Sequence, residues 1–382
     1  MTKVILVTVT MTLGVFMLSV LMVTQVNSTN WNTTAKQDIV AFKQAIMDNH
    51  PGVFNAEDPE FMMILNTGYE ESLLAADQVY LKEDYLKVLR DYAHLFDDPH
   101  LGISPTDEFD VPASKISAGA ACSSHFGIAE LEPDMFWISL PTFEPNQEQQ
   151  KNLESIIQRL PDLAQSKLII FDLRDNGGGN SAWGNKIGEA LFGKDYFRSL
   201  QRPASVWWQV STGNIDFLQS YVTTFEKQFG IDSKEYEWAA TTHYGMKKAQ
   251  TAGHNFYVVE RRSDANDFPI QNPVKAHLVA IIDEECASAS LDFLDFLRVV
   301  EPPVLFVGRT TAADTIYMDV RSVILPSGYA RLTFPMKMYT QRMRGNRQAY
   351  HPDIVYDGDM NNTQELQKFI FSLKARLVAP SL

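Results

Sequence analysis

The serine best placed for nucleophilic chemistry lies between an apolar strand pattern and a helical pattern. Ser288 belongs to Cys286-Ala287-Ser288-Ala289-Ser290, after the apolar run 277–282 and before leucines at 291, 294 and 297. A serine hydroxyl attacks a carbonyl only when a base takes its proton and N–H groups hold the resulting oxyanion. We therefore expect the chain to supply a base and an oxyanion hole. In the alternative interpretation, the small residues only let a helix pack closely on a strand.

A glycine-rich loop is the candidate for the oxyanion hole. Residues 168–173 predict a buried strand, and Arg174-Asp175-Asn176-Gly177-Gly178-Gly179-Asn180 follows directly. Glycines allow positive φ and leave N–H groups accessible to an anion. The loop lacks the Gly-Lys-Ser/Thr ending of a P-loop and the GxGxxG spacing of a dinucleotide site. We expect the N–H groups of Gly178 and Ala289 to hold the oxyanion, although a run of glycines can also form an ordinary tight turn.

These segments together resemble one family of enzymes. Residues 172–179 resemble the D-L-R-x-N-x-G-G loop of the tail-specific (C-terminal processing) and tricorn-core serine peptidases, and residues 287–290 resemble their nucleophile segment. Residues 95–101 are similar to their L-x-D-x-H segment, and residues 350–355 to their P-D-I/V strand. The resemblance implies an α/β fold of the crotonase/ClpP-like type, in which a mixed sheet is flanked by helices and a small helical domain precedes it.

A histidine is the general base that the resemblance implies. Tail-specific peptidases have a lysine about 25 residues after the serine, within a G-x-x-T-x-G-K-G segment. Here residues 308–315 read GRTTAADT, and no lysine occurs between Ser288 and Lys337. His100 matches the histidine of the tricorn-core branch, and an imidazole can shuttle a proton near neutral pH. The structural alternative for His100 is a helix C-cap.

The acid that orients His100 is left open by the sequence. The tricorn pattern has a serine beside the histidine and a distant glutamate, whereas Pro99 precedes His100 and no glutamate occurs between residues 301 and 365. Three aspartates remain as candidates: Asp97, Asp98 and Asp314.

Composition limits the classes of partner. The chain has 382 residues, 45% hydrophobic content and a net charge of -14, and no run of lysines or arginines. These values argue against nucleic acid or an anionic membrane surface as partners, and a peptide or protein substrate is expected. No histidine or cysteine spacing indicates a metal site, and no cofactor is expected. The oligomeric state and a pairing of Cys122 with Cys286 stay open.

The N-terminus carries an export segment. Met1-Thr2-Lys3 precedes an apolar stretch that reaches Val26, and small residues near Ser28 would allow cleavage. The stretch is long for a signal peptide and just long enough to span a bilayer, so membrane anchoring is the alternative. We expect a periplasmic or secreted protein.

Four segments describe the expected domain organisation. Residues 1–28 form the signal peptide or anchor, 29–104 a helical domain, and 105–382 the catalytic domain, which contains an aromatic-rich insertion at about 200–272. Only about two dozen residues separate Gly102 from Phe126, too few for a peptide-binding PDZ domain. We expect the insertion to form a mostly helical lid, unless its aromatic residues are ordinary core. The basic cluster 342–347 could hold a substrate carboxylate, or it could lie in a solvated loop and pair with nearby aspartates.

Two other functions remain beside the peptidase. Interphotoreceptor retinoid-binding proteins resemble the same family, so the chain could be a non-catalytic carrier of apolar ligands. It could also be an esterase or another acyl hydrolase, because the serine and histidine select acyl transfer and not the leaving group.

Overall fold

The computed structural model describes residues 29–107, 125–200, 204–261 and 270–377. The expected signal peptide or anchor at 1–28 and Cys122 lie outside these ranges. Within them, every helix is too short or too polar to span a bilayer.

A six-stranded sheet forms the centre of the catalytic part. Its order is β11 (Ile354–Val355), β8 (Leu305–Gly308), β7 (His277–Ile282), β4 (Leu168–Asp172), β3 (Met135–Ser139) and β2 (Gly127–Glu132), and only the β2–β3 pair is antiparallel. β4 is buried at every position, as expected for a parallel strand covered on both faces. Asp172 of β4 pairs with Ile281 of β7. The glycine loop and the nucleophile turn therefore leave the same edge of the sheet.

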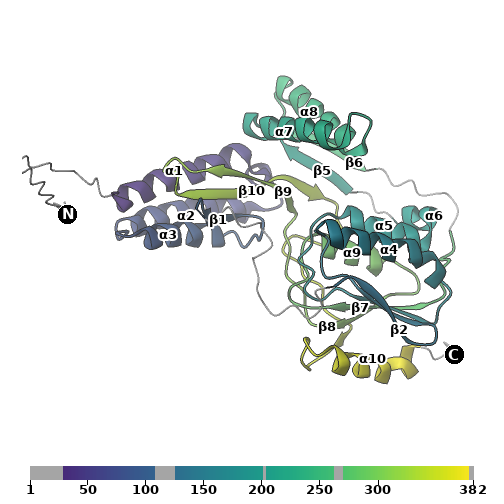
Figure 1. The fold of residues 1–382 in the computed structure, drawn as a ribbon. Coiled ribbons are helices and arrows are strands. Elements are labelled where there is room, and N and C mark those ends of the chain that lie inside the picture. The colour runs from purple at the N-terminus through teal and green to yellow at the C-terminus, as the bar shows by residue number, and fades with distance from the viewer. Residues whose placement is uncertain (1–28, 108–124, 201–203, 262–269, 378–382) are drawn as a thin grey trace, which may run out of the picture.

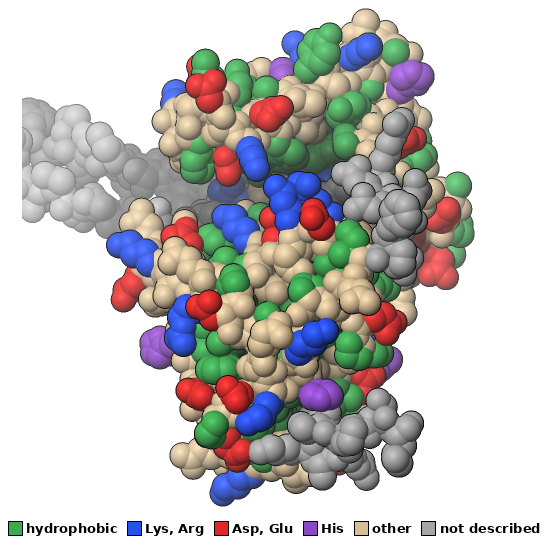
Figure 2. All heavy atoms as spheres, turned by 90° about the vertical axis from the view of Figure 1, so that its right-hand side faces the viewer, with side chains coloured by type: hydrophobic (Ala, Val, Ile, Leu, Met, Phe, Trp, Pro, Cys, Tyr) green, Lys and Arg blue, Asp and Glu red, His purple; other side chains and the backbone are tan. Residues whose placement is uncertain are grey.

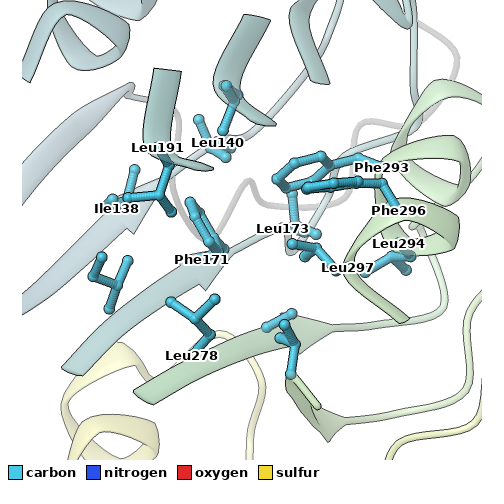
Figure 3. Close-up of a cluster of buried hydrophobic side chains, with 14 of the residues drawn as sticks. Ile138, Leu140, Phe171, Leu173, Leu191, Leu278, Phe293, Leu294, Phe296 and Leu297 are labelled. Atoms are coloured by element: carbon cyan, nitrogen blue, oxygen red, sulfur yellow. The ribbon is translucent and has the colours of Figure 1, made fainter. Parts of the chain in front are cut away.

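Helices cover both faces of this sheet (Figure 1). The helices α4 (Gln147–Leu163), α5 (Ala182–Phe192), α6 (Lys194–Ser199) and α9 (Ala289–Arg298) lie on one face, and α10 (Thr363–Leu377) lies on the other. Figure 3 shows the larger core, in which Phe171 of β4 meets Phe293 of α9 edge to face at 5.6 Å. The apolar face of α9 thus fixes the start of that helix, immediately after Ser288, against the sheet.

The segment expected to form a helical domain, residues 29–104, is mostly helical. α1 (Trp31–Asn49), the short η1 (Pro51–Phe54), α2 (Pro59–Ala76) and α3 (Lys82–His94) follow one another. α2 has Asp58 at its N-cap and Pro59 in its first turn, as the Asp-Pro signal predicts. The sequence Thr34-Ala35-Lys36-Gln37 predicts a capping box at the start of the first helix. This prediction is wrong, because α1 begins earlier and Asn30 caps it by accepting the Thr33 N–H.

A second, antiparallel sheet joins these helices to the rest of the chain. Its order is β1 (Gly102–Pro105), β10 (Ala330–Thr340), β5 (Ala204–Gln209) and β6 (Phe256–Arg261), and β9 (Tyr317–Ile324) pairs with the other edge of β10. Leu332 and Phe334 of β10 lie in one core with the residues of α1, α2 and α3. The helical part from 29 to 104 therefore shares its core with strands from the C-terminal half.

The aromatic insertion is half helical. α7 (Thr212–Phe229) and α8 (Lys234–Thr251) lie between β5 and β6, which are hydrogen-bonded to each other and continue the second sheet. Trp208 is 2% exposed and packs with Leu218 and Met246 in a small core of its own. The expectation of a mostly helical lid misses these strands, and the alternative of ordinary core describes such residues better.

Candidate active site

Ser288 has an unusual backbone conformation. It is the N-cap of α9, with φ 52° and ψ -120°. A positive φ is uncommon for a residue with a side chain, and such strain gathers at functional sites. β7 ends at Ile282, so five residues separate the strand from Ser288. The predicted strand, turn and helix around Ser288 are confirmed.

The glycine loop lies directly against Ser288. Gly178 has φ +97°, and a Cβ built there would lie 2.7 Å from the Ala287 carbonyl oxygen and 2.7 Å from the Ser288 Cβ. The Ala287 N–H also donates to the Asn176 carbonyl at 3.2 Å. Only glycine at position 178 allows the two backbones to come this close.

The N–H groups of Gly178 and Ala289, the two expected oxyanion donors, differ in whether they already have a hydrogen-bond acceptor. Ala289 is the first residue of α9, and its N–H has no acceptor among the residues that the structure describes. The first N–H groups of a helix are free in this way and carry the positive end of the helix dipole. The Gly178 N–H, in contrast, donates to Asn176 Oδ1 at 3.0 Å. The Gly178 N–H can therefore bind an oxyanion only after it breaks its hydrogen bond to Asn176 Oδ1.

His100 lies in the turn between α3 and β1. α3 ends at His94, six residues earlier, so the alternative of a helix C-cap is wrong. The imidazole Nδ1 lies 3.2 Å from Asp98 Oδ1 and 3.7 Å from Asp314 Oδ1. Burial alone lowers the pKa of His100, but the Asp98 and Asp314 carboxylates outweigh it and raise this pKa above its usual value.

Two of the three candidate acids meet at His100. Asp98 also accepts the His100 backbone N–H at 2.8 Å, and Asp314 is 1% exposed. Asp97 is exposed at a positive φ of 47° and takes part in no contact with the imidazole among the described residues. Burial raises the pKa of Asp314, while His100 and then Arg344 oppose that rise.

The segment that carries Asp314 runs beside the nucleophile turn. The Ala312 N–H donates to the Cys286 carbonyl at 3.2 Å, two residues before Ser288. Asp314 therefore links the turn of Ser288 to His100. The Ser288 hydroxyl and the imidazole form no hydrogen bond with each other in this arrangement of the described residues. Catalytic hydrogen bonds often close only in the substrate complex.

The basic cluster pairs with aspartates, as one of the two interpretations predicts. Arg344 is 2% exposed and forms ion pairs with Asp292, Asp295 and Asp314. Arg347 donates to the Phe96 carbonyl at 3.2 Å. The pairing with nearby aspartates is therefore confirmed, although Arg344 itself is buried and not solvated. Asp292 and Asp295, three apart on one helix face, were the signal in the sequence for a buried basic partner.

A cavity of about 160 Å³ opens beside α9, and Asp292, Asp295, Phe296 and Arg342 belong to its lining. Figure 2 shows that basic side chains gather in the hollow below the lobe that α7 and α8 form. Among the described residues, no group of histidine, cysteine or carboxylate side chains could hold a metal ion.

Comparisons with known proteins identify the family. The sequence model of peptidase family S41 matches residues 134–356, more than half of the 382-residue chain. No curated protein is significantly similar in sequence.

Solved structures share the fold at low identity. A Parabacteroides merdae protein assigned as a peptidase is 15% identical, with a TM-score of 0.53, and the alignment covers 91% of this chain and 98% of that chain. Mature CPAF is 11% identical with a TM-score of 0.58, and 92% and 98% are covered. Its complex with lactacystin is 11% identical with a TM-score of 0.59, and 92% and 99% are covered.

These comparisons confirm the mixed α/β fold and the family that the sequence motifs resemble. The chain belongs to peptidase family S41, the family of the tail-specific peptidases, and is a serine-type peptidase.

Proposed function

We propose that the protein cleaves peptide bonds through an acyl-enzyme formed on Ser288, with His100 as the general base. The observation that carries this proposal is the close approach of Gly178 to Ser288, which brings the backbone of the glycine loop and the N-terminus of α9 to one hydroxyl. Such an arrangement supplies N–H groups where an oxyanion forms.

The orientation of His100 supports its role as the base. Nδ1 faces the Asp98 and Asp314 carboxylates, which favour the neutral tautomer with its proton on Nδ1. Nε2 is then the basic nitrogen. It accepts the Ser288 proton as Oγ attacks the carbonyl carbon, and returns this proton to the leaving amine when the C–N bond breaks. Water then attacks the ester, with Nε2 again accepting the proton, and regenerates the Ser288 hydroxyl.

The oxyanion is held by backbone N–H groups in this proposal. Ala289 offers an N–H that lacks an acceptor, and Gly178 offers a second once it leaves Asn176 Oδ1. Loss of one such donor typically costs about 10²- to 10³-fold in kcat.

Export is a separate part of the proposal. The apolar stretch in residues 1–28 supports a periplasmic or secreted peptidase, either released or anchored by that stretch. Mass spectrometry of the purified protein from its native host tests this. A mature N-terminus near residue 29 supports release, an intact Met1 supports anchoring, and an intact chain in the cytoplasm rejects export.

Hydrolysis kinetics test the catalytic part. Ser288→Ala is expected to abolish cleavage of a fluorogenic peptide library, and His100→Ala to lower kcat by about 10³-fold or more. Ser290→Ala is the matched control, because that serine lies only two residues from Ser288, in the first turn of α9, and is buried there. Unchanged cleavage in Ser288→Ala would reject the assignment. Ser288-dependent cleavage of esters but of no peptide would favour the acyl hydrolase alternative.

A further inference from the structure

Arg344 binds three carboxylates at once in the interior of the protein. Its Nη1 lies 3.0 Å from Asp314 Oδ2, its Nη2 lies 3.4 Å from Asp292 Oδ1, and its Nε lies 3.3 Å from Asp295 Oδ1. The Arg344 side chain is 1% exposed. Every nitrogen of the guanidinium thus faces an acid, and the cost of burying these charges is offset only by their mutual pairing.

The three carboxylates belong to the two parts of the proposed catalytic site. Asp292 and Asp295 lie on α9, which begins directly after Ser288. They are three residues apart, so both side chains lie on the same side of the helix. Asp314 instead faces His100, with its Oδ1 3.7 Å from Nδ1. One guanidinium therefore connects the nucleophile helix with the acid beside the base.

Additional hydrogen bonds fix the two α9 carboxylates. Asp292 Oδ2 accepts from the Ser181 hydroxyl at 2.7 Å, just before α5 begins, and Asp295 Oδ1 accepts from the Tyr350 hydroxyl at 2.6 Å. Asp314 has less support, because its Oδ1 is buried without a hydrogen-bond partner among the described residues. The position of Asp314 therefore depends on Arg344 more than the positions of Asp292 and Asp295 do.

Neighbouring Arg342 does not replace Arg344. Arg342 donates from Nε to the Arg344 carbonyl at 3.2 Å and from Nη2 to the Thr315 carbonyl at 3.2 Å. Its Nη1 lies 3.8 Å from Asp314 Oδ2, beyond hydrogen-bond distance. Arg342 thus donates hydrogen bonds to backbone carbonyls, while Arg344 donates a hydrogen bond directly to Asp314.

We propose that Arg344 is a positioning residue, which holds Asp314 against His100 at a fixed place relative to Ser288. The inference rests on the proposed function of Ser288 and His100. Arginine suits this role because its planar fork can bind several carboxylates in fixed directions, whereas the lysine ammonium is a flexible point charge. The charged groups that face His100 are Asp98, Asp314 and Arg342, so a change at Arg344 reaches the imidazole through Asp314.

The variant Arg344→Lys tests the proposal, because it keeps the charge and loses the fork. We expect kcat to fall about 10- to 100-fold while KM changes less than about two-fold, as expected when a catalytic group is misplaced. We also expect the titration midpoint of His100, followed by NMR on histidine-labelled full-length protein, to fall toward that of an ordinary histidine. Arg298→Lys is the control, because Arg298 also joins α9 to an aspartate, Asp353, without touching Asp314.

Two results separate this inference from the proposed function. Unchanged kcat and unchanged His100 midpoint in Arg344→Lys, or equal effects in Arg298→Lys, would overturn the positioning role. The titration needs no turnover, so it reports on Arg344 even if the wild type cleaves no peptide and the proposed function fails. If Arg344→Lys does not fold, Arg344→Lys/Asp295→Asn removes one competing carboxylate, and the same lowered midpoint is expected.

Discussion

A Cβ on Gly178 would lie 2.7 Å from the Cβ of Ser288, so the glycine loop and the proposed nucleophile touch through their backbones. Residues 110 positions apart meet here because β4 and β7 are adjacent parallel strands whose carboxyl ends lie side by side. Ligand and active sites of such sheets form at this edge.

Gly178→Ala is predicted to abolish most of the activity. The new methyl group would meet the Ala287 carbonyl oxygen and the Ser288 Cβ at 2.7 Å, and the φ of +97° is strained for alanine. We expect kcat/KM to fall at least about 100-fold, comparable to the loss of an oxyanion donor. Gly177→Ala is the control, because a Cβ there meets nothing within 4 Å. Equal activity of the two variants would show that the approach at Gly178 does not matter.

The activity is predicted to rise with pH through a pKa above the ordinary value of histidine. The base must be neutral, and the nearby carboxylates raise the pKa of His100 despite its burial, so the protonated form persists to higher pH. The acid limb of kcat/KM against pH reports this group in the free enzyme. Asp314→Asn should move the limb to lower pH while lowering kcat. A limb that stays in place would mean that Asp314 does not act on the base.

Asp283 is predicted to destabilise the fold as the pH rises from about 4 to about 6. Burial raises the pKa of Asp283 to about 6, although its carboxylate accepts the Asp175 N–H at 3.0 Å. A carboxyl group with a raised folded-state pKa binds more protons in the native state, so stability falls across that window. Asp283→Asn should remove this component, measured as a smaller decrease of Tm between pH 4 and pH 6 than in the wild type. A decrease of equal size would contradict the assignment.

Arg174→Met is predicted to destabilise the protein by about 3 to 5 kcal/mol, as when a buried pair loses one partner. Arg174 and Asp172 are both 0% exposed, with Nη2 2.6 Å from Oδ2, directly before the glycine loop. Lys36→Met is the control, because the Lys36–Asp77 pair is exposed at both ends and such pairs contribute little. Urea unfolding measures both variants. Similar free energies of unfolding in Arg174→Met and Lys36→Met would show that the buried pair contributes no more to stability than the exposed pair.

The sequence predicts the local elements of the site better than their long-range contacts. The apolar runs at 168–173 and 277–282 predict β4 and β7, and the Asp58-Pro59 pair predicts the start of α2, because each signal is local. The pairing of β1 with β10 joins residues more than 200 positions apart, and nothing in either segment specifies the partner. The helical domain consequently looked separate in the sequence.

The contacts around His100 likewise could be predicted only in part from the sequence. The motif at 95–101 identified the histidine, and Asp98 and Asp314 were two of three candidate acids. Arg344 joins Asp314 to α9, and this contact forms only when side chains from three segments pack together in the interior. Spacing along the chain carries no information about such a contact, apart from the pair of aspartates on one face of α9.

Covalent labelling shows directly whether Ser288 is the nucleophile. The full-length protein is treated with a fluorophosphonate, and the modified residue is located by peptide mass spectrometry. We expect one adduct, on Ser288, that is lost in Ser288→Ala, formed more slowly in His100→Ala and retained in Ser290→Ala. An unlabelled wild type, or an adduct that persists in Ser288→Ala, would contradict the assignment of Ser288 as the nucleophile.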